Sequence, residues 1–193
     1  MYEAAFANAT ALGDASISGA PGKATRTYRY YTGSPTHVFG DGLSYAQFDL
    51  SCSAAPSGGD LPAAQNFSVA LACASALAAG SPAGDQVLLV YHSTGADVAA
   101  AVAGAHPIPF STLRQFDRVA LAAGGGGGQA PSQWQLAPLH FALTNAAGAA
   151  VLYPGTHTLT VSGFGGARVQ WQQNFTVTGA ARVLSAPPPY YPA

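Results

Sequence analysis

The chain has 193 residues, enough for one domain with an extension, and its formal net charge at pH 7 is -1. Charged residues make up only 8% of the sequence, well below the roughly 25% of ordinary globular chains. The seven lysines and arginines are scattered, so there is no basic patch for a phosphate backbone. No run approaches the roughly 20 apolar residues of a membrane span. We therefore expect neither nucleic acid nor a membrane among the partners.

An aromatic-rich segment, residues 27–48, lies near the N-terminus and reads TYRYYTGSPTHVFGDGLSYAQF. Two turn signals interrupt it, Gly33-Ser34-Pro35 and Gly40-Asp41-Gly42. Its aromatic residues are Tyr28, Tyr30, Tyr31, Phe39, Tyr45 and Phe48. Aromatic residues this dense between turns predict a chain laid across an apolar surface before it enters a β domain.

Alternation with a period of two residues follows along most of the chain and predicts strands. In residues 66–73, for example, Phe67, Val69, Leu71 and Cys73 share one face. The run QVLLVY is apolar on both faces, which is typical of a central strand. The strand candidates are residues 45–52, 66–73, 86–91, 114–121, 134–143, 156–161 and 168–177. About seven such strands predict an all-β, immunoglobulin-like sandwich.

The connections between these strands are rich in Gly and Pro. Residues 124–128 are five glycines, which predicts a flexible loop. Residues 93–111 form a long connection in which we expect one Ala-rich helical turn. The Pro-rich tail, from residue 181 onward, is expected to be disordered.

The two cysteines, Cys52 and Cys73, both fall on inward faces, which suggests a disulfide. A hairpin of residues 45–52 and 66–73 would, however, place Cys52 beside Asn66 and Cys73 beside Tyr45. Seven residues at about 3.3 Å each would separate the thiols by roughly 20 Å, beyond the ~6 Å that a disulfide spans. We therefore expect two buried free thiols, with a disulfide as the alternative.

No catalytic constellation emerges from the titratable residues. Four of the eight carboxylates directly follow a glycine, which is typical of turns rather than of an acid/base pair. The five histidines show no metal-ligand spacing, and we expect His157 to be a hydrogen-bonded core residue. Trp134 and Trp171 belong to apolar strand faces, so core packing is a better interpretation than sugar stacking. We expect no catalytic residue, no cofactor and no metal site.

Signals of compartment disagree with one another. The chain begins Met1-Tyr2-Glu3 without a basic or apolar leader, so no signal peptide is expected in it. Three sequons nevertheless make Asn8, Asn66 and Asn174 possible N-glycosylation sites.

Read together, the motifs resemble glycoside hydrolase family 3, especially its plant-type β-xylosidase and α-arabinofuranosidase group. TYRYYTG and HVFGDGLSYAQF resemble the family's TYRFYTG…FGxGLSYTxF signature. Further along, AGDQVLLVY, LRQFDRVAL and GTHTLTV resemble three of its strands, in the family's order. The resemblance covers residues 27–178, and the loops at residues 75–82 and 124–128 depart from it.

The resemblance implies a fibronectin type III-like domain at the C-terminal end of such an enzyme. Residues 1–44 would be an irregular remnant of the preceding α/β catalytic domain, residues 45–180 the sandwich and residues 181–193 the tail. A catalytic barrel alone takes about 250 residues, so the parent's catalytic carboxylates would lie outside this chain. The predicted interface to the catalytic domains comprises Tyr28, Arg29, Tyr30, Tyr31, Phe39 and Asp41.

The function that follows is a non-catalytic accessory domain that stabilises those catalytic domains. The parent would hydrolyse terminal β-xylosyl or α-arabinosyl residues of xylan or arabinan, outside the cell or in the cell wall. Plant-type cell-wall polysaccharide is a further possible partner. The alternative is a stand-alone polysaccharide-binding or wall-associated module, which would need a row of exposed aromatic side chains. A third reading, a hydrolase complete in this chain, lacks the residues of an active site.

Overall fold

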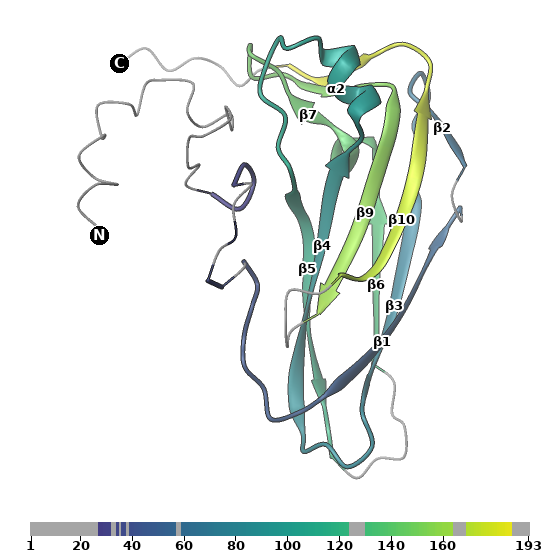
Figure 1. Cartoon of the computed structure of the whole chain (residues 1–193). Coiled ribbons are helices and arrows are strands. Elements are labelled where there is room, and N and C mark those ends of the chain that lie inside the picture. Colours follow the sequence, from purple (N-terminus) through teal and green to yellow (C-terminus); the bar gives the residue numbers. More distant parts are fainter. Residues whose placement is uncertain are drawn as a thin grey trace, which may run out of the picture.

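Strands dominate the computed structural model, which describes residues 27–31, 34, 36–37, 39–56, 59–123, 130–163 and 169–186 (Figure 1). The strands are β1 (Phe48–Ala55), β2 (Asp60–Pro62), β3 (Val69–Leu77), β4 (Gly84–Thr94), β5 (Thr112–Leu121), β6 (Ala130–Leu136), β7 (Leu143–Thr144), β8 (Ala150–Leu152), β9 (Gly155–Gly163), β10 (Val169–Thr178) and β11 (Arg182–Ser185). The helices are α2 (Ala96–Val102) and the 3₁₀ helix η3 (Pro138–Phe141). Among the described residues, no helix is long and apolar enough to cross a bilayer.

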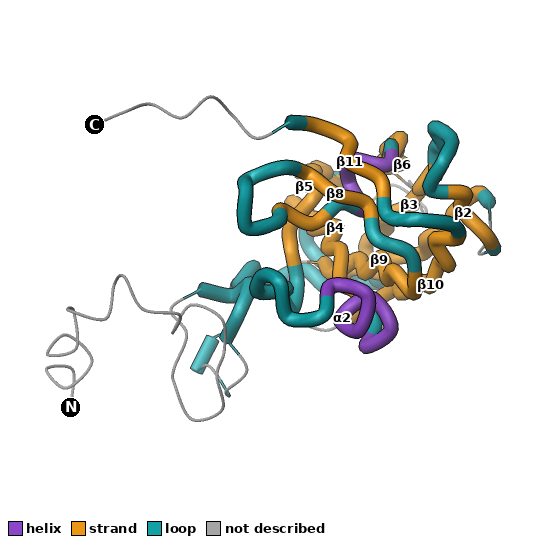
Figure 2. Tube along the Cα trace, turned by 90° about the horizontal axis from the view of Figure 1, so that it is seen from above, coloured by secondary structure: helices purple, strands orange, loops and turns teal. Residues whose placement is uncertain are grey.

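Two sheets form the layers of the fold (Figures 1 and 2). The smaller sheet has the order β1-β3-β6 and the larger one the order β2-β10-β9-β4-β5. A third small sheet, with the order β11-β8-β7, lies at one end. The interior position of β4, between β9 and β5, agrees with its apolar sequence, whereas the immunoglobulin-like type stays a prediction.

The core fills the space between the two layers. Every second residue of β3 from Val69 to Ser75 is buried, as the alternating sequence predicts. Leu88 and Val90 of β4 and Phe175 of β10 are also almost fully buried, as is Phe141 of η3. Each such side chain contributes about 1.5–3 kcal/mol when it leaves water. The described members of the main core cluster therefore lie at or after Phe48, where β1 begins.

The expectation of free thiols is wrong, because Cys52 and Cys73 form a disulfide. β1 and β3 pair antiparallel with Cys52 directly opposite Cys73, and their Cα atoms are 4.1 Å apart. The assumed hairpin register failed because no tight turn joins the two strands. β2 lies between them in sequence and pairs with β10 in the other sheet. This long connection releases β3 from the register that a short turn would impose.

Two other predictions need adjustment. The start of the tail belongs to the fold, because β11 pairs antiparallel with β8; residues 187–193 lie outside the described residues. The candidate at residues 134–143 is not one bulged strand, because β6 ends at Leu136 and η3 follows it. The expected helical turn of the long connection is the seven-residue helix α2. The glycine loop also lies outside the described residues.

Candidate functional site

The described residues between 27 and 45, which we call the strap, lie outside the sandwich beside β4 and β5 (Figures 1 and 2). Two hydrogen bonds attach its first part to the chain that enters β5. The Phe110 N–H donates to the carbonyl oxygen of Arg29 over 2.6 Å, and the Leu113 N–H donates to the Tyr28 hydroxyl over 3.0 Å. The strap then crosses to the opposite sheet, where β1 begins at Phe48.

Three rings form what we call the surface aromatic cluster, Tyr28, Phe39 and Tyr91. Tyr28 stacks on Phe39 with ring centroids 4.3 Å apart, and it meets Tyr91 of β4 edge-on at 6.1 Å. The Tyr91 hydroxyl donates to the Phe39 carbonyl over 3.4 Å. Burial, with a smaller contribution from neighbouring Tyr28, raises the pKa of Tyr91 to about 12. Phe39 remains 53% exposed, so the cluster has one uncovered side.

Gly40 lets the strap approach the sheet closely. Its φ is +85°, and a Cβ atom there would overlap Cδ1 of Leu89. A side chain would therefore be strained in conformation, and the end of the Leu89 side chain would have to move to make room for it. The turn predicted at residues 40–42 thus allows the strap to lie directly against Leu89.

The outer face of the five-stranded sheet is polar at one side and apolar at the other. Leu89 and Tyr91 of β4 pair with Phe116 and Leu113 of β5, and Phe116 is 71% exposed. On β9 and β10, the residues on this outer face are polar. The Thr158 hydroxyl of β9 donates to Asn174 of β10 over 2.9 Å. The strap covers part of the apolar side. This explains why β4 is apolar on both faces.

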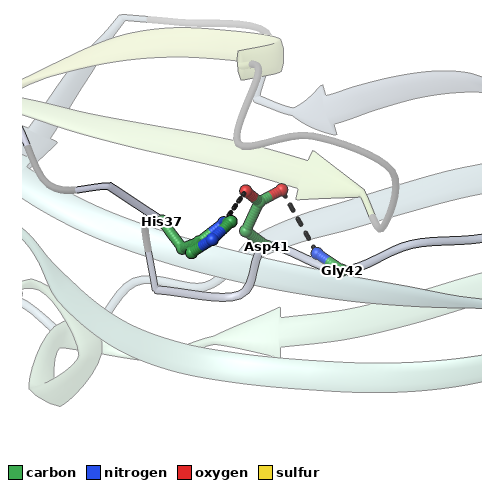
Figure 3. A network of polar contacts seen from close by, with 3 residues as sticks. All are labelled: His37, Asp41 and Gly42. Carbon is green, nitrogen blue, oxygen red and sulfur yellow. Dashed lines mark hydrogen bonds and ion pairs between the residues drawn. The ribbon is translucent and has the colours of Figure 1, made fainter.

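The remaining predicted interface residues lie in the strap but outside the surface aromatic cluster. Tyr30 and Tyr31 are partly buried, and the guanidinium of Arg29 lies 5.5 Å from the centre of the Tyr30 ring. Asp41 accepts from the Gly42 N–H over 3.2 Å and lies 3.7 Å from His37 (Figure 3). This arrangement stabilises the second turn of the strap.

Sequence reasoning missed Arg114, which lies next to the strap. The register between β4 and β5 shifts so that Gln115 and Leu113 oppose consecutive residues of β4, and Arg114 is the extra residue of this bulge. Bulges redirect side chains, and here Nη2 of Arg114 donates to the Ala142 carbonyl over 2.5 Å. A bulge leaves no signal in the local sequence, so periodicity could not have found this residue.

Two buried histidines form the other notable polar group. His157 Nε2 donates to the Tyr153 carbonyl over 2.9 Å, and His157 Nδ1 accepts from His92 Nε2 over 2.9 Å. Burial lowers the pKa of both rings, and the neighbouring charge of Arg114 adds to this effect. His157 is thus the hydrogen-bonded core residue that the sequence predicts.

Asp97 of α2 binds the start of β9. It accepts from the Thr156 N–H over 2.7 Å and from the Thr156 hydroxyl over 2.8 Å. Desolvation would raise the pKa of Asp97, but these hydrogen bonds outweigh it and lower the pKa. The arrangement joins the helix to the sheet. Within the described ranges, no three His, Cys, Asp or Glu residues gather where they could hold a metal ion.

The sequons and tryptophans have simple surroundings. Asn66 and Asn174 are exposed, and Asn8 lies outside the described residues. Both tryptophans, Trp134 and Trp171, pack against the core, in agreement with the interpretation from the sequence. The described tryptophans therefore do not form an exposed platform for sugars.

No protein-family model matches the chain. Its fold is nevertheless similar to a β-rich segment of a much longer β-glucosidase, and part of the chain is homologous to xylosidases of glycoside hydrolase family 3. It is 30% identical over 180 residues to the probable exo-1,4-β-xylosidase xlnD of Aspergillus japonicus, and equally to that of Aspergillus aculeatus. The alignment covers 84% of this chain and 21% of each relative, so the chain spans about a fifth of their length.

Solved structures agree at the level of the fold. A β-glucosidase from Listeria innocua in complex with glucose has a TM-score of 0.60 at 22% identity, covering 85% of this chain and 22% of that one. A β-glucosidase from Erythrobacter marinus has a TM-score of 0.61 at 20% identity, covering 84% and 19%. In each case this chain matches only about a fifth of a larger hydrolase. The two probable xylosidases confirm the predicted resemblance to β-xylosidases in part, whereas the fibronectin type III-like type stays a prediction.

Proposed function

We propose that this chain is a non-catalytic accessory domain of a family 3 glycoside hydrolase and that it stabilises the catalytic domains by docking against them. The sandwich would be of the fibronectin type III-like kind and would lie at the C-terminal end of the parent. The parent would release terminal β-xylosyl or α-arabinosyl residues from xylan or arabinan, outside the cell or in the cell wall. Homology to probable β-xylosidases supports this choice of parent.

The observation that carries the proposal is the uncovered side of the surface aromatic cluster. The strap is seated on β4 by Gly40, yet Phe39 stays 53% exposed. Phe116 of β5 is 71% exposed and Phe110 is 68% exposed. Large rings exposed on a segment that is itself held in place are typical of a surface that binds another protein domain. The predicted interface residues all lie in this strap.

A hybrid enzyme tests the proposal. The region of the Aspergillus japonicus relative that aligns with this chain, 21% of its length, is replaced by this chain, and the same relative without that region serves as the reference. Residual hydrolysis of an aryl β-xyloside is measured after heating. We expect the hybrid to outlast the truncated enzyme several-fold. Equal heat lability of the two proteins would contradict the proposal.

The non-catalytic part of the proposal has a direct test. The purified 193-residue chain is incubated with aryl xylosides, arabinosides and glucosides. We expect no turnover, because Asp41, Asp85 and Asp97 bind backbone N–H groups, a threonine or an exposed arginine rather than facing one another as a pair. Turnover by the chain alone would show that it contains an active site.

The stand-alone binding module has less support. Its strongest candidates for sugar stacking, Trp134 and Trp171, pack against the core, and the outer face of β9 and β10 is lined by Thr, Asn and Gln. Affinity electrophoresis on xylan and arabinan decides this alternative. We expect no retardation of the chain in either gel.

A further inference from the structure

Two of the three sequons lie in the described part of the chain and face solvent. Residues 66–68 are in the connection between β2 and β3, and residues 174–176 are in β10. At each site the asparagine and the hydroxyl residue are exposed, whereas the middle residue, Phe67 or Phe175, packs in or against the core. Both side chains that define an N-glycosylation sequon therefore lie on the surface of the folded chain.

The hydrogen bonds of the two asparagines leave the nitrogen that would carry a sugar available. Nη2 of Arg182 donates to Oδ1 of Asn66 over 2.7 Å, and the Thr158 hydroxyl donates to Oδ1 of Asn174 over 2.9 Å. Arginine has no acceptor atom, so the side-chain amide of Asn66 can turn only its oxygen toward Arg182. Among the described residues, neither Nδ2 atom has a hydrogen-bond partner. A sugar on Nδ2 would leave both contacts intact.

The side of the sandwich that carries these asparagines lies away from the strap. In the order β2-β10-β9-β4-β5, β9 separates β10 from β4, on which the strap packs (Figure 1). β2 pairs with residues 176–178 of β10, so Asn174 lies beyond its end. The outer face of β9 and β10 is lined by Thr, Asn and Gln, which can form hydrogen bonds with sugar hydroxyls. Asn66 follows β2, the strand at the opposite end of this order from β5.

The disulfide points independently to the compartment in which N-glycosylation takes place. Cys52 and Cys73 are the two cysteines of the chain, and they are bonded to each other. Disulfides form and persist in the secretory pathway and outside the cell, and they are rare in the cytosol. The register of β1 and β3 that brings the cysteines together owes nothing to either sequon. Two unrelated features of the chain therefore favour the same compartment.

We propose that Asn66 and Asn174 each carry an N-linked oligosaccharide on the side of the sandwich away from the strap. The donor is an oligosaccharide attached to a lipid pyrophosphate, and a transferase of the secretory pathway catalyses the step. Nδ2 forms a bond to the anomeric carbon of the first sugar, and the bond from that carbon to the pyrophosphate oxygen breaks. The lipid pyrophosphate leaves and Nδ2 loses one proton, so nothing is oxidised or reduced. This modification does not depend on the proposed function.

Isotope labelling at the site of deglycosylation tests the proposal. The protein is isolated from its native cells, and the same chain is also secreted from eukaryotic cells behind a cleavable leader. Peptide N-glycosidase in ¹⁸O-labelled water converts each glycosylated asparagine to aspartate that contains the heavy oxygen, which mass spectrometry locates. We expect the label at Asn66 and Asn174 in both preparations, and none at Asn145, which is outside any sequon. An unlabelled Asn66 or Asn174 in the folded protein would overturn the inference.

Variants of the hydroxyl residues test each site while both asparagines are kept. Ser68→Ala and Thr176→Ala should each remove one glycan, seen as a step in gel mobility, and the double variant should remove both. The matched controls Ser68→Thr and Thr176→Ser keep the sequons and should keep the glycans. Ser68→Thr also keeps the hydroxyl that donates to Gln135, so it separates loss of the sequon from loss of that hydrogen bond. Unchanged mobility of Ser68→Ala and Thr176→Ala would contradict the inference.

The hybrid enzyme tests whether the glycans lie outside the docking surface, and this arm alone rests on the proposed function. We expect peptide N-glycosidase to remove both glycans from the folded, secreted hybrid as fast as from the folded chain alone. Much slower removal from a stabilised hybrid would overturn the placement of the glycans while leaving the proposed function intact. A glycosylated hybrid that is not stabilised on heating would reject the proposed function and leave the two modification sites supported.

Discussion

Two aromatic clusters in this chain are built from similar groups, but one is buried in the core and the other is partly exposed at the surface. The interior cluster comprises Phe67, Phe141, Phe175, His92 and His157, and Phe141 meets four of these rings at centroid distances of 5.5–6.1 Å. In the surface aromatic cluster, Tyr28 stacks on Phe39 at 4.3 Å, but Phe39 remains 53% exposed. Ring contacts alone therefore do not distinguish a core from a docking surface.

The difference between the clusters lies in what surrounds the rings. Phe141 contacts rings from β4, β9 and β10 and the ring of Phe67, which precedes β3, and its exposed fraction is 0%. Around Phe39, the described contacts are the stacked ring of Tyr28 and the Tyr91 hydroxyl of β4, which donates to the Phe39 carbonyl. The first cluster stabilises this chain by itself. The second is expected to reach its full effect only when another domain covers it.

The sharpest test of the comparison is Phe141→Ala. Truncation of a fully buried Phe removes its transfer free energy and leaves a cavity, so we expect a loss of about 3–5 kcal/mol in the free energy of unfolding. Leu139→Ala, in the same 3₁₀ helix but 53% exposed, should change it by less than about 0.5 kcal/mol. Urea unfolding measures both variants. Similar losses in the two would show that Phe141 does not organise the core.

The disulfide tests whether the sandwich and the strap are separable. Cys52→Ala combined with Cys73→Ala removes a link across a sequence separation of 21 residues, which should cost about 2–4 kcal/mol. The link joins β1 to β3, whereas the strap packs on β4 in the other sheet. We expect global stability to fall while the Tyr28–Tyr91 contact persists, as seen by nuclear Overhauser effects. Loss of that contact in the folded variant would show that the two regions are coupled.

The sequence could predict the long strands but not how they pair. Apolar patterning placed strands at β1, β3, β5, β9 and β10 by alternation, at β4 by a run that is apolar on both faces, and at the start of the 134–143 candidate, where β6 lies. The short strands β2, β7, β8 and β11 contain two to four residues, which is too few to show a period. Register is a property of distant partners, so the Cys52–Cys73 pair could not be read from local spacing.

The pH dependence of stability tests the interior cluster. The pKa values of His92 and His157 are lowered in the fold by burial, whereas in the unfolded chain they are near 6.5. Below about pH 6.5 the unfolded state therefore binds protons that the native state excludes. The free energy of unfolding is retained above that pH and falls as the pH decreases, by up to about 1.4 kcal/mol per pH unit for each histidine.

Urea unfolding between pH 8 and pH 5 measures this slope. His92→Phe should reduce it, and His37→Gln, whose side chain is 83% exposed, should not. The charged groups near the pair are Arg114, which opposes protonation of both rings, and Asp97, which favours that of His157. An unchanged slope in His92→Phe would mean that other groups cause the acid sensitivity.

The candidate site was only partly accessible from the sequence. The motif around Tyr28 and Phe39 pointed to an interface, and the structure stacks these two rings. The surface of β4 on which the strap packs also had a signal in the sequence, a run that is apolar on both faces. That run was interpreted only as a central strand. Arg114 had none, because its position depends on a bulge and on the neighbouring carbonyl of Ala142.

The smallest expected effect belongs to Phe39→Ala in the chain alone. A half-exposed ring with one stacked neighbour should contribute about 0.5–1 kcal/mol to the free energy of unfolding, far less than Phe141. In the hybrid enzyme the same change should shorten survival on heating, while the equally exposed control Leu139→Ala should not. A loss in the isolated chain as large as that of Phe141→Ala would place the strap in the core and remove the distinction between the clusters. If Phe39→Ala has little effect on the stability of the chain and on the survival of the hybrid enzyme, the two clusters still differ in burial. The surface aromatic cluster would then not contribute to docking.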